Sequence, residues 1–495
     1  MTDRAAGGRT VIAWFRRDLR LHDHPALHAA IRSADRIVPA FILDDALLCG
    51  RPGAPARVAF MLASLEALAA DLAARGAPLV VRSGPPAAAI AALAAETDAT
   101  DVFVSRDVGP YARARDGAVT AALAADGRTL HAMPGLLVVE PEDLLTGEGR
   151  PYTVFTPYAR RWAATPRRVS LPAPGRIAGH PGFGPDRAGR VPAIGDLGIP
   201  APSLRDIPAA GEAAARARLD GWVASGLDAY ADRRDLLGAD GTSRLSQDLR
   251  WGLLSPVEVL DRAGGAGDGP RTFANELAWR DFYSQVLFHF PHAARGSFRP
   301  VYDGLPWRDD PVGLDAWRGG RTGFPVVDAA MRQLAATGWM HNRARMIVAS
   351  FLAKDLLVDW RAGERHFMER LVDGDLASNN GGWQWAAGTG TDAQPWFRVF
   401  DPVAQGRRHD PDGAYVRRWV PELSCVPDRH VHAPWTMPAD VAAAAGVVVG
   451  RDYPAPIVDH AAARRRALEA YRSVRVGTGP VGAGGPSSPD PRPRP

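Results

Sequence analysis

Residues 10–15 form the sequence TVIAWF, a short apolar and β-branched run of the kind that makes a buried strand. Because strand and helix signals alternate after it, we predict a Rossmann-like α/β domain at residues 1–135, with a parallel sheet covered by helices. No G-x-G-x-x-G motif follows the first strand, so a dinucleotide clamp is not expected there. The other strand-like runs lie at 37–43, 78–82, 101–105 and 129–133, and the helical stretches between them at 56–75, 86–97 and 113–125.

Beyond residue 135 the strand signals end. Residues 163–208 are rich in Pro, Gly and Arg and show no periodicity, which is typical of a linker that crosses the surface. Helical spacing then dominates, for example at 273–290, 326–336, 343–358 and 364–371. We therefore place a linker at 136–208, an all-α domain at 209–475 and a disordered tail at 476–495.

The composition excludes several classes of protein. The chain has 495 residues, of which 46% are hydrophobic, enough for a large core and two or more domains. Its two cysteines, Cys49 and Cys425, are too few for a disulfide framework, a four-cysteine zinc site or an iron–sulfur cluster. No apolar run of 18 residues and no secretory signal is present, so we expect a cytoplasmic protein without a membrane span. The net charge of +4 is weak grounds for a nucleic-acid partner, because a GC-rich genome also favours Arg.

Residues 241–246, GTSRLS, precede a helical run. Taken alone, the motif favours ordinary capping of that helix by a hydroxyl. The alternative is a phosphate site, made by backbone N–H groups and hydroxyls with Arg244 adding charge.

Two predicted helices carry polar and aromatic residues on one face. Glu276, Trp279, Arg280 and Tyr283 share one face, and Trp339, Asn342, Arg345 and Met346 share another. Such a face suits either a solvated surface or a cavity that holds a flat heterocycle, with aromatic rings to stack and Glu276 to accept N–H bonds.

Residues 373–385, DGDLASNNGGWQW, are the most distinctive stretch of the helical half. The paired glycines let the backbone approach a ligand closely. Carboxylates at this spacing could bind a metal, but no His or Cys accompanies them. We therefore expect hydrogen bonds to a ligand or to Arg345, and no metal.

With these motifs in view, the chain resembles the photolyase/cryptochrome family. The match opens with WFRRDLRLHDHPAL at 14–27, where His24 replaces the usual Asn. It resumes at Tyr230 and at 241–246, continues through 275–283 and 322–371, and is densest at 339–343 and 373–385. The resemblance implies an α/β domain that carries an antenna chromophore, followed by an all-α domain that binds FAD. It favours a class I photolyase specific for cyclobutane pyrimidine dimers.

The resemblance also implies roles for individual residues around FAD. Arg345, Asp373, Gly374 and Asp375 should contact the isoalloxazine or the ribose, and Asn379 should face flavin N5. Phe273 stands where some relatives have a Trp near the flavin. The FAD phosphates should lie against Tyr230, Thr242, Ser243, Arg244, Leu245 and Ser246.

A second set of roles concerns DNA. The resemblance places Arg234 and Arg280 against DNA phosphates, and Trp307, Trp360 and Trp383 on an electron relay that ends at the flavin. It implies that the dimer flips out of ultraviolet-damaged DNA and is split by an electron from excited reduced FAD. Glu276 would stabilise the dimer radical anion by a hydrogen bond or by supplying a proton. Its neutral form would require that burial raise the pKa of Glu276. The pocket for the lesion should comprise Glu276, Trp279, Tyr283, Asn342, Met346 and Trp385.

The antenna is predicted from two shorter stretches, DVGPYARARD at 107–116 and APARVA at 54–59. Both resemble the subgroup that binds 8-hydroxy-5-deazaflavin, and Asp107 and Arg57 are the candidate polar contacts. Their alternative roles are a helix start and a surface position. Methenyltetrahydrofolate is the alternative antenna, but its subgroup has an Asn-Glu pair where this chain has Tyr111 and Ala112.

The main alternative function is a cryptochrome-type blue-light receptor. Asn379, Glu276, Met346 and the two pocket tryptophans argue against it, as does the short tail. A (6-4) photolyase would carry paired His near 340–342, and a flavin oxidoreductase would need a nicotinamide site. We expect a monomer without an obligate protein partner.

Overall fold

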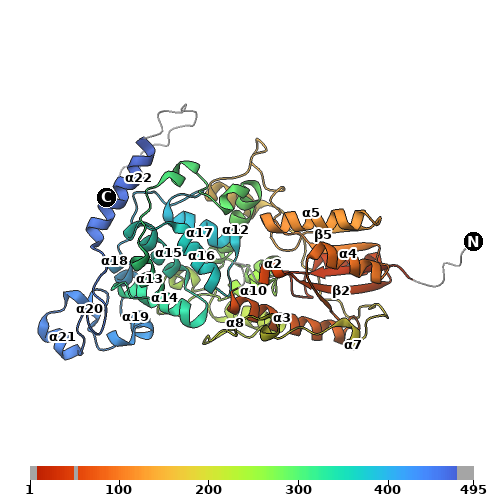
Figure 1. The fold of residues 1–495 in the computed structure, drawn as a ribbon, viewed down its shortest axis with the longest axis horizontal. Coiled ribbons are helices and arrows are strands. Elements are labelled where there is room, and N and C mark those ends of the chain that lie inside the picture. The colour runs from red at the N-terminus through yellow and green to blue at the C-terminus, as the bar shows by residue number, and fades with distance from the viewer. Residues whose placement is uncertain (1–7, 49–53, 477–495) are drawn as a thin grey trace, which may run out of the picture.

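The computed structural model describes residues 8–48 and 54–476. Figure 1 shows a sheet with its covering helices at one end of the molecule and helices α18 to α21 at the other. The predicted tail lies outside the described residues except for Val476, which ends the last helix. Within the described ranges, no helix combines the length and apolarity needed to cross a membrane.

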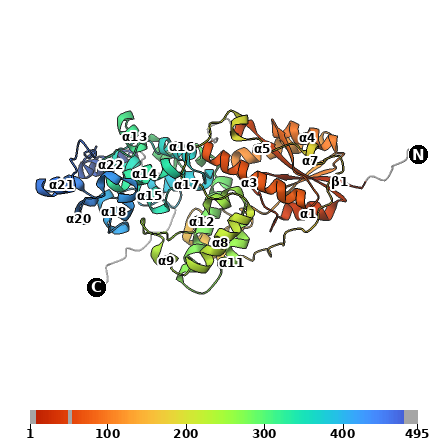
Figure 2. The ribbon, with the colours of Figure 1, turned by 90° about the horizontal axis from the view of Figure 1, so that it is seen from below.

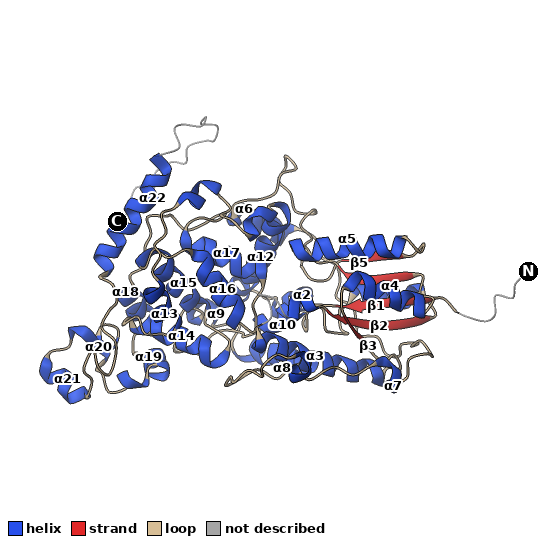
Figure 3. Cartoon of the chain, viewed as in Figure 1, coloured by secondary structure: helices blue, strands red, loops and turns tan. Residues whose placement is uncertain are grey.

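The sheet has five strands, all parallel, in the order β3-β2-β1-β4-β5. Each predicted run forms a strand within two residues of its expected bounds, and these strands are red in Figure 3. The strand order reverses between β1 and β4, and ligands of such sheets bind at the carboxyl ends beside this point. The strands are β1 Thr10–Phe15, β2 Arg36–Leu43, β3 Val80–Ser83, β4 Asp101–Ser105 and β5 Thr129–Met133.

Helices cover both faces of the sheet, as the apolar spacing predicts. Ile90 and Leu93 of α4 and Val119 of α5 pack with Ile12 of β1 on one face. On the other face α1 and α3 join a core that continues into the helical half. These helices are α1 Pro25–Ser33, α2 Asp45–Leu48, α3 Pro55–Ala74, α4 Pro86–Glu96 and α5 Pro110–Ala124.

The stretch predicted as a linker, 136–208, is mostly irregular but contains a ten-residue helix, α6 Phe155–Ala164. Its signal is weak in the sequence because only Tyr158 and Trp162, one turn apart, are buried. Pro157 lies in the first turn, where it removes no helical hydrogen bond. The stretch also contains α7 Pro185–Ala188 and the 3₁₀ turn η1 Ile194–Leu197.

The remainder is helical, as predicted, and the helix predicted at 343–358 ends in a π-helical turn. Figure 2 shows α8, α9, α11 and α12 grouped beside the α/β half. The α-helices are α8 Glu212–Ser225, α9 Tyr230–Arg233, α10 Ser246–Trp251, α11 Pro256–Ala263, α12 Asp268–His289, α13 Pro311–Arg318, α14 Pro325–Thr337, α15 Asn342–Ser350, α16 Trp360–Arg370, α17 Leu376–Ala387, α18 Pro402–His409, α19 Ala414–Trp419, α20 Asp428–Val431, α21 Ala439–Ala445 and α22 His460–Val476. The short turns are η2 Pro291–Ala294, η3 Pro300–Gly304, η4 Phe351–Asp355 (the π turn), η5 Pro421–Leu423 and η6 Pro434–Thr436.

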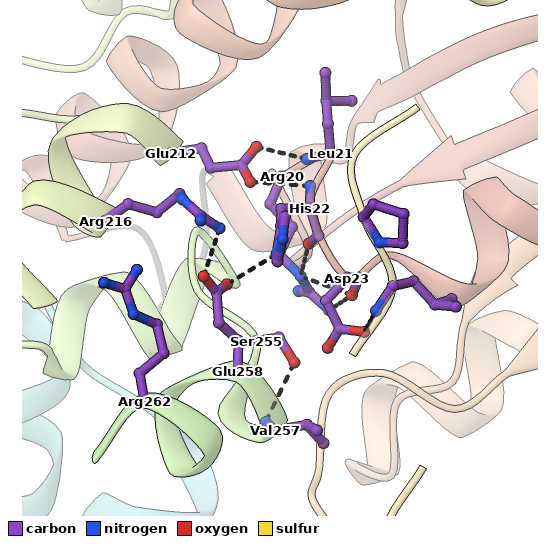
Figure 4. Close-up of polar contacts among 12 residues, drawn as sticks. Arg20, Leu21, His22, Asp23, Glu212, Arg216, Ser255, Val257, Glu258 and Arg262 are labelled. Carbon is purple, nitrogen blue, oxygen red and sulfur yellow. Dashed lines mark hydrogen bonds and ion pairs between the residues drawn. The ribbon is translucent and has the colours of Figure 1, made fainter. Parts of the chain in front are cut away.

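The two halves are joined by a polar group, which we call the junction cluster: the buried Arg20 and Asp23 and the half-buried Arg168 and Glu212. Figure 4 shows Arg20, Asp23 and Glu212. The Arg20 guanidinium is fully buried and donates to the carbonyls of residues 22, 23, 135 and 252. Glu212 accepts from the backbone N–H groups of residues 21 and 22. Asp23 accepts from Arg168 at 2.7 Å and from the N–H of residue 171. These bonds hold the segment after β1 against the helical half.

Candidate flavin and DNA site

Helix α12 presents Glu276, Trp279 and Tyr283 on one face, as their spacing predicts. The Trp279 ring lies flat on Phe155 of α6, with centroids 3.6 Å apart and planes 8° apart. Tyr283 follows one turn later, with its ring centroid 5.3 Å from that of Trp279. Phe155 was not predicted from the sequence, because its surroundings lack periodicity. One face of Trp279 is therefore packed against protein.

Glu276 pairs with Arg234, which follows α9. The Arg234 Nη1 to Glu276 Oε1 distance is 2.7 Å, and the guanidinium lies 5.3 Å from the centre of the Tyr230 ring. Burial raises the pKa of Glu276, although the charge of Arg234 opposes the shift. The raised pKa agrees in direction with what a proton-donating role would need.

Arg280 points away from this face. Its guanidinium donates to the carbonyl of Leu136 at 2.7 Å and to that of Leu249 at 3.4 Å, and it lies 3.6 Å from Asp281. Burial lowers its pKa. The described contacts therefore use Arg280 at the junction of the two halves, and its contact with a DNA phosphate stays a prediction.

The capping interpretation of 241–246 is wrong. Helix α10 begins at Ser246 with Leu245 as its N-cap, and no side chain caps it. The hydroxyls of Thr242 and Ser243 make no hydrogen bond to any described residue. Arg244 has a left-handed backbone (φ 50°), and its guanidinium lies 4.5 Å from the centre of the Trp339 ring. The hydroxyls are thus left available for a ligand.

The carboxylates before α17 have separate partners. Asp373 accepts from Arg345 Nη2 at 2.8 Å through Oδ2, while its Oδ1 is buried without a partner. Asp375 caps α17 through the N–H of Ser378 and accepts from Arg17 Nη2 at 2.7 Å. Burial opposes ionisation of Asp375, but Arg17 and two further arginines hold its pKa well below the usual range. No group of three or more potential ligands suited to a metal occurs within 8–48 and 54–476.

The two glycines of α17 differ in their surroundings. A Cβ on Gly381 would meet the Tyr283 ring at 2.1 Å, whereas a Cβ on Gly382 would have no atom within 4 Å. Gly382 lies one turn after Asn379, whose Nδ2 donates to the backbone and side-chain oxygens of Glu364 at 3.0 and 3.1 Å. Open space therefore adjoins the face of α17 that carries Asn379. At the start of the same segment, a Cβ on Gly374 would meet Arg57 at 2.4 Å.

The three helices predicted to carry the site converge, since α17 packs against both α12 and α15. Asn342 begins α15 and is exposed, and Met346 follows one turn later, half-buried. Trp385, near the end of α17, is also half-buried. Phe273 is buried and meets the Tyr230 ring edge to face at 5.5 Å, so aromatic packing accounts for it.

Two of the three tryptophans predicted as a relay are buried and the third is partly exposed. Trp383 and Trp360 are 2% and 1% exposed, and Trp307 is half-buried. The Trp383 ring lies against Gly363, one turn after Trp360 in α16. All three indole N–H groups are buried and have no partner among the described residues.

The candidate antenna contacts lie where the halves meet. Arg57 is 3% exposed and donates to the carbonyl of Leu371 at 2.8 Å, so the alternative surface role is wrong for it. Asp107 follows β4 and lies 3.6 Å from Arg17. Burial opposes ionisation of Asp107, but Arg17 and its neighbours lower the pKa of Asp107. Tyr111, at the start of α5, donates its hydroxyl to Asp44.

The residues around α17 fit a flavin nucleotide. Buried polar atoms in folded proteins almost always have partners, so an open acceptor in a polar site indicates a ligand. Asp373 Oδ1 is such an acceptor, the hydroxyls of 242 and 243 lack partners, and Gly382 adjoins open space. We call Thr242, Ser243, Arg345, Asp373, Asn379 and Gly382 the flavin cluster.

A parallel α/β domain joined to a helical domain with such a cluster defines a two-domain flavoprotein. Residues 11–175 match the family model described as DNA photolyase, and residues 273–473 match the model described as FAD binding domain of DNA photolyase. A deoxyribodipyrimidine photo-lyase of Streptomyces griseus is 44% identical over 92% of this chain and 97% of its own. The chain belongs to the photolyase/cryptochrome family.

Solved structures agree. A class III photolyase from Agrobacterium tumefaciens matches with a TM-score of 0.90 and 39% identity, over 96% of this chain and 99% of its own. A cryptochrome from Synechocystis matches with a TM-score of 0.86 and 31% identity, over 93% of this chain and 99% of its own. A photolyase from Sulfolobus tokodaii, solved with two FAD molecules, matches with a TM-score of 0.81 and 30% identity, over 94% of this chain and 100% of its own. The predicted family, fold class, FAD-binding domain and DNA-repair photolyase are confirmed.

Proposed function

We propose that the chain is a class I photolyase that repairs cyclobutane pyrimidine dimers in ultraviolet-damaged DNA. The observation that carries the proposal is the convergence of α12, α15 and α17 on one site with an open acceptor, Asp373 Oδ1. Bound reduced FAD supplies, on excitation by light, the electron that splits the dimer. We also propose that the chain acts as a monomer in the cytoplasm, with domains at 1–135 and 209–475.

The flavin cluster would hold the cofactor. Thr242 and Ser243 can donate their hydroxyl protons to the phosphates, and Asp373 can accept from the cofactor through Oδ1. Asn379 already donates its amide N–H to Glu364, which leaves its Oδ1 free to accept a hydrogen bond from a protonated nitrogen of the cofactor. The backbone carbonyl of Glu364 also accepts from Nδ2 and holds the amide in this orientation. Asn379 would therefore present Oδ1 to a protonated flavin N5.

The lesion pocket would use Trp279, Glu276 and Trp385. The Phe155 ring fixes the plane of Trp279, and the exposed part of this half-buried indole would contact a flipped pyrimidine. Glu276 would hydrogen-bond the lesion, and the half-buried Trp385 would close the other wall. Extrusion costs least for a base that pairs and stacks poorly, so a dimer is preferred to an intact step.

Trp383, Trp360 and Trp307 would carry electrons from the surface to the cofactor. The difference in burial supports this direction, since the half-buried Trp307 can exchange electrons with solvent while Trp360 and Trp383 lie in the core.

We propose 8-hydroxy-5-deazaflavin as the antenna, with Asp107 and Arg57 near its site. The Sulfolobus tokodaii photolyase, solved with two FAD molecules, supports the presence of a second chromophore. Absorption of the purified protein in the deazaflavin band, compared with the band of methenyltetrahydrofolate, tests the choice.

The function is tested with reduced holoprotein and a duplex that carries one cyclobutane dimer. We expect blue light, and not darkness, to restore the intact pyrimidines. Glu276→Ala should lower the yield of repair per photon while FAD stays bound. Failure to repair under reducing conditions and blue light would favour a cryptochrome-type receptor, a function suggested by the likeness to the Synechocystis cryptochrome.

A further inference from the structure

Arg234 and Glu276 form an ion pair at the proposed lesion pocket. The two side chains are 23% and 31% exposed, so the pair is desolvated on one side and open on the other. The Arg234 guanidinium is also supported by the Tyr230 ring, 5.3 Å from its centre. Both residues are therefore within reach of a ligand that enters from solvent.

Glu276 has one cation and several groups that are neutral or negative around it. Arg234 and Asp235, which follow α9, face it. The phenols of Tyr283 on its own helix and of Tyr230 on α9 also face it. Asp235 is itself paired with Arg343 of α15, at 2.6 Å. Within the described ranges, Arg234 is thus the cation that opposes the charge of Glu276.

We infer that Arg234 is a positioning residue that keeps Glu276 ionised until a phosphate of the damaged strand draws the guanidinium away, at which point Glu276 takes up a proton. The inference rests on the proposed function, in which Arg234 meets a phosphate and Glu276 meets the lesion. The proton comes from solvent and forms a carboxylic acid, so no other reactant is needed.

The exchange follows from general electrostatics. A phosphate competes well for a guanidinium, because it offers two charge-matched acceptor oxygens. Glu276 would then be covered by the lesion, beside the like charge of Asp235 and without a counter-ion, and each of these conditions favours the neutral acid. Burial raises the pKa of Glu276 even with Arg234 in place. The neutral acid carries an O–H that can donate to a carbonyl of the dimer, which a carboxylate cannot do.

The test is calorimetric titration of the holoprotein in the dark with a duplex carrying one dimer, at pH 7, in buffers of different ionisation enthalpy. The dependence of the binding enthalpy on the buffer counts the protons taken up. We expect uptake of up to one proton with dimer DNA and none with undamaged duplex. Glu276→Gln should abolish the uptake.

Variants of Arg234 separate positioning from simple binding. Arg234→Gln leaves Glu276 without a counter-ion in the free protein, so uptake should fall toward zero, and the salt slope of DNA binding should fall by about one. Arg234→Lys keeps the cation and should retain the uptake. The matched control is Glu422→Gln, which breaks the Arg332–Glu422 pair at the same 2.7 Å spacing, with both side chains 26% exposed; it should match the wild type.

The outcomes are distinct. Binding that prefers dimer DNA without proton uptake, or uptake that survives Glu276→Gln, overturns the inference and leaves the proposed function intact. If the protein showed no preference for dimer DNA and no light-dependent repair, the proposed function itself would be wrong.

Discussion

The junction cluster and the flavin cluster are both polar and each contains a buried carboxylate, Asp23 or Asp373, yet they differ in how far their groups are paired. All three guanidinium nitrogens of Arg20 donate to backbone carbonyls, and both oxygens of Asp23 and of Glu212 accept. In the flavin cluster, Asp373 keeps an open buried oxygen. An unpaired buried polar atom costs about 1–3 kcal/mol, and the open oxygen of Asp373 is therefore a candidate to bind a ligand.

The difference predicts opposite responses to substitution. Changes in the junction cluster should lower the free energy of unfolding and leave FAD affinity unchanged in the molecules that stay folded. Changes in the flavin cluster should lower FAD affinity without destabilising the apoprotein. Four experiments test this contrast.

The largest effect is expected for Arg20→Ala. The substitution leaves four carbonyls without their donor, three of them buried, and removes the charge beside Asp23; such losses cost on the order of 4 kcal/mol. Urea unfolding of the apoprotein measures the change. Arg150→Ala is the control, because its side chain is 75% exposed and paired only with an exposed Glu148; it should change stability by less than about 0.5 kcal/mol. Equal losses for the two variants would contradict a structural role for Arg20.

The second experiment uses pH. Burial opposes ionisation of Asp23, but hydrogen bonds from Arg168, Ser255 and Leu171 outweigh it and lower the pKa to about 2. A lowered carboxyl pKa stabilises the folded state above the unfolded value near 3.8, and this contribution is lost as pH falls through about 2. Asp23→Asn fits the same left-handed backbone (φ 51°) and should be about 2 kcal/mol less stable than the wild type at pH 7.

The stability gap between Asp23→Asn and the wild type should shrink from about pH 4 toward pH 2. Urea unfolding of both proteins across this range measures it, and other carboxylates cancel in the difference. A gap that stays constant with pH would show that the charge of Asp23 contributes nothing to the junction.

Two adjacent glycines give a matched third test. Gly381→Ala would drive a methyl group into the Tyr283 ring and should destabilise the apoprotein by about 1–3 kcal/mol. Gly382→Ala adds a methyl group to open space, and should stabilise α17 by about 0.5–1 kcal/mol through helix propensity. The same methyl group should weaken FAD binding, measured by titration of the apoprotein. If the Gly382→Ala variant bound FAD normally, the cofactor could not bind against this face of α17.

The sequence predicts elements well where one residue period dominates. The five strands and helices such as α12 and α14 follow from runs of apolar residues whose spacing needs no knowledge of partners. Periodicity also places Glu276, Trp279 and Tyr283 on one face. It does not indicate which residue packs against that face, so the stack of Phe155 on Trp279 could not be predicted from α6.

Partners from distant parts of the chain are likewise missing from any local pattern. Arg280 has the spacing of a site residue, yet it donates to Leu136, 144 residues away. Arg57, predicted as either an antenna contact or a surface residue, is buried and donates to the carbonyl of Leu371. The two glycines 381 and 382 are equivalent in sequence, and only the position of the Tyr283 ring distinguishes them. Long-range contacts of this kind depend on the docking of whole elements, which side-chain period alone does not determine.

The smallest effect is expected for single hydroxyls. Thr242→Val keeps the shape of the side chain and removes a hydroxyl that makes no hydrogen bond to the described residues, so apoprotein stability should change by less than about 0.5 kcal/mol. If that hydroxyl donates to a cofactor phosphate, its loss should cost about 1 kcal/mol of binding, or roughly fivefold in FAD affinity. The matched control is Thr97→Val, whose buried hydroxyl donates to the carbonyl of Leu93 at 2.8 Å; it should lose about 1 kcal/mol of stability and no FAD affinity. Should Thr242→Val instead lose stability and keep its FAD affinity, residues 241–246 would have a structural role like that of the junction cluster, and the phosphates of the cofactor would have to bind elsewhere.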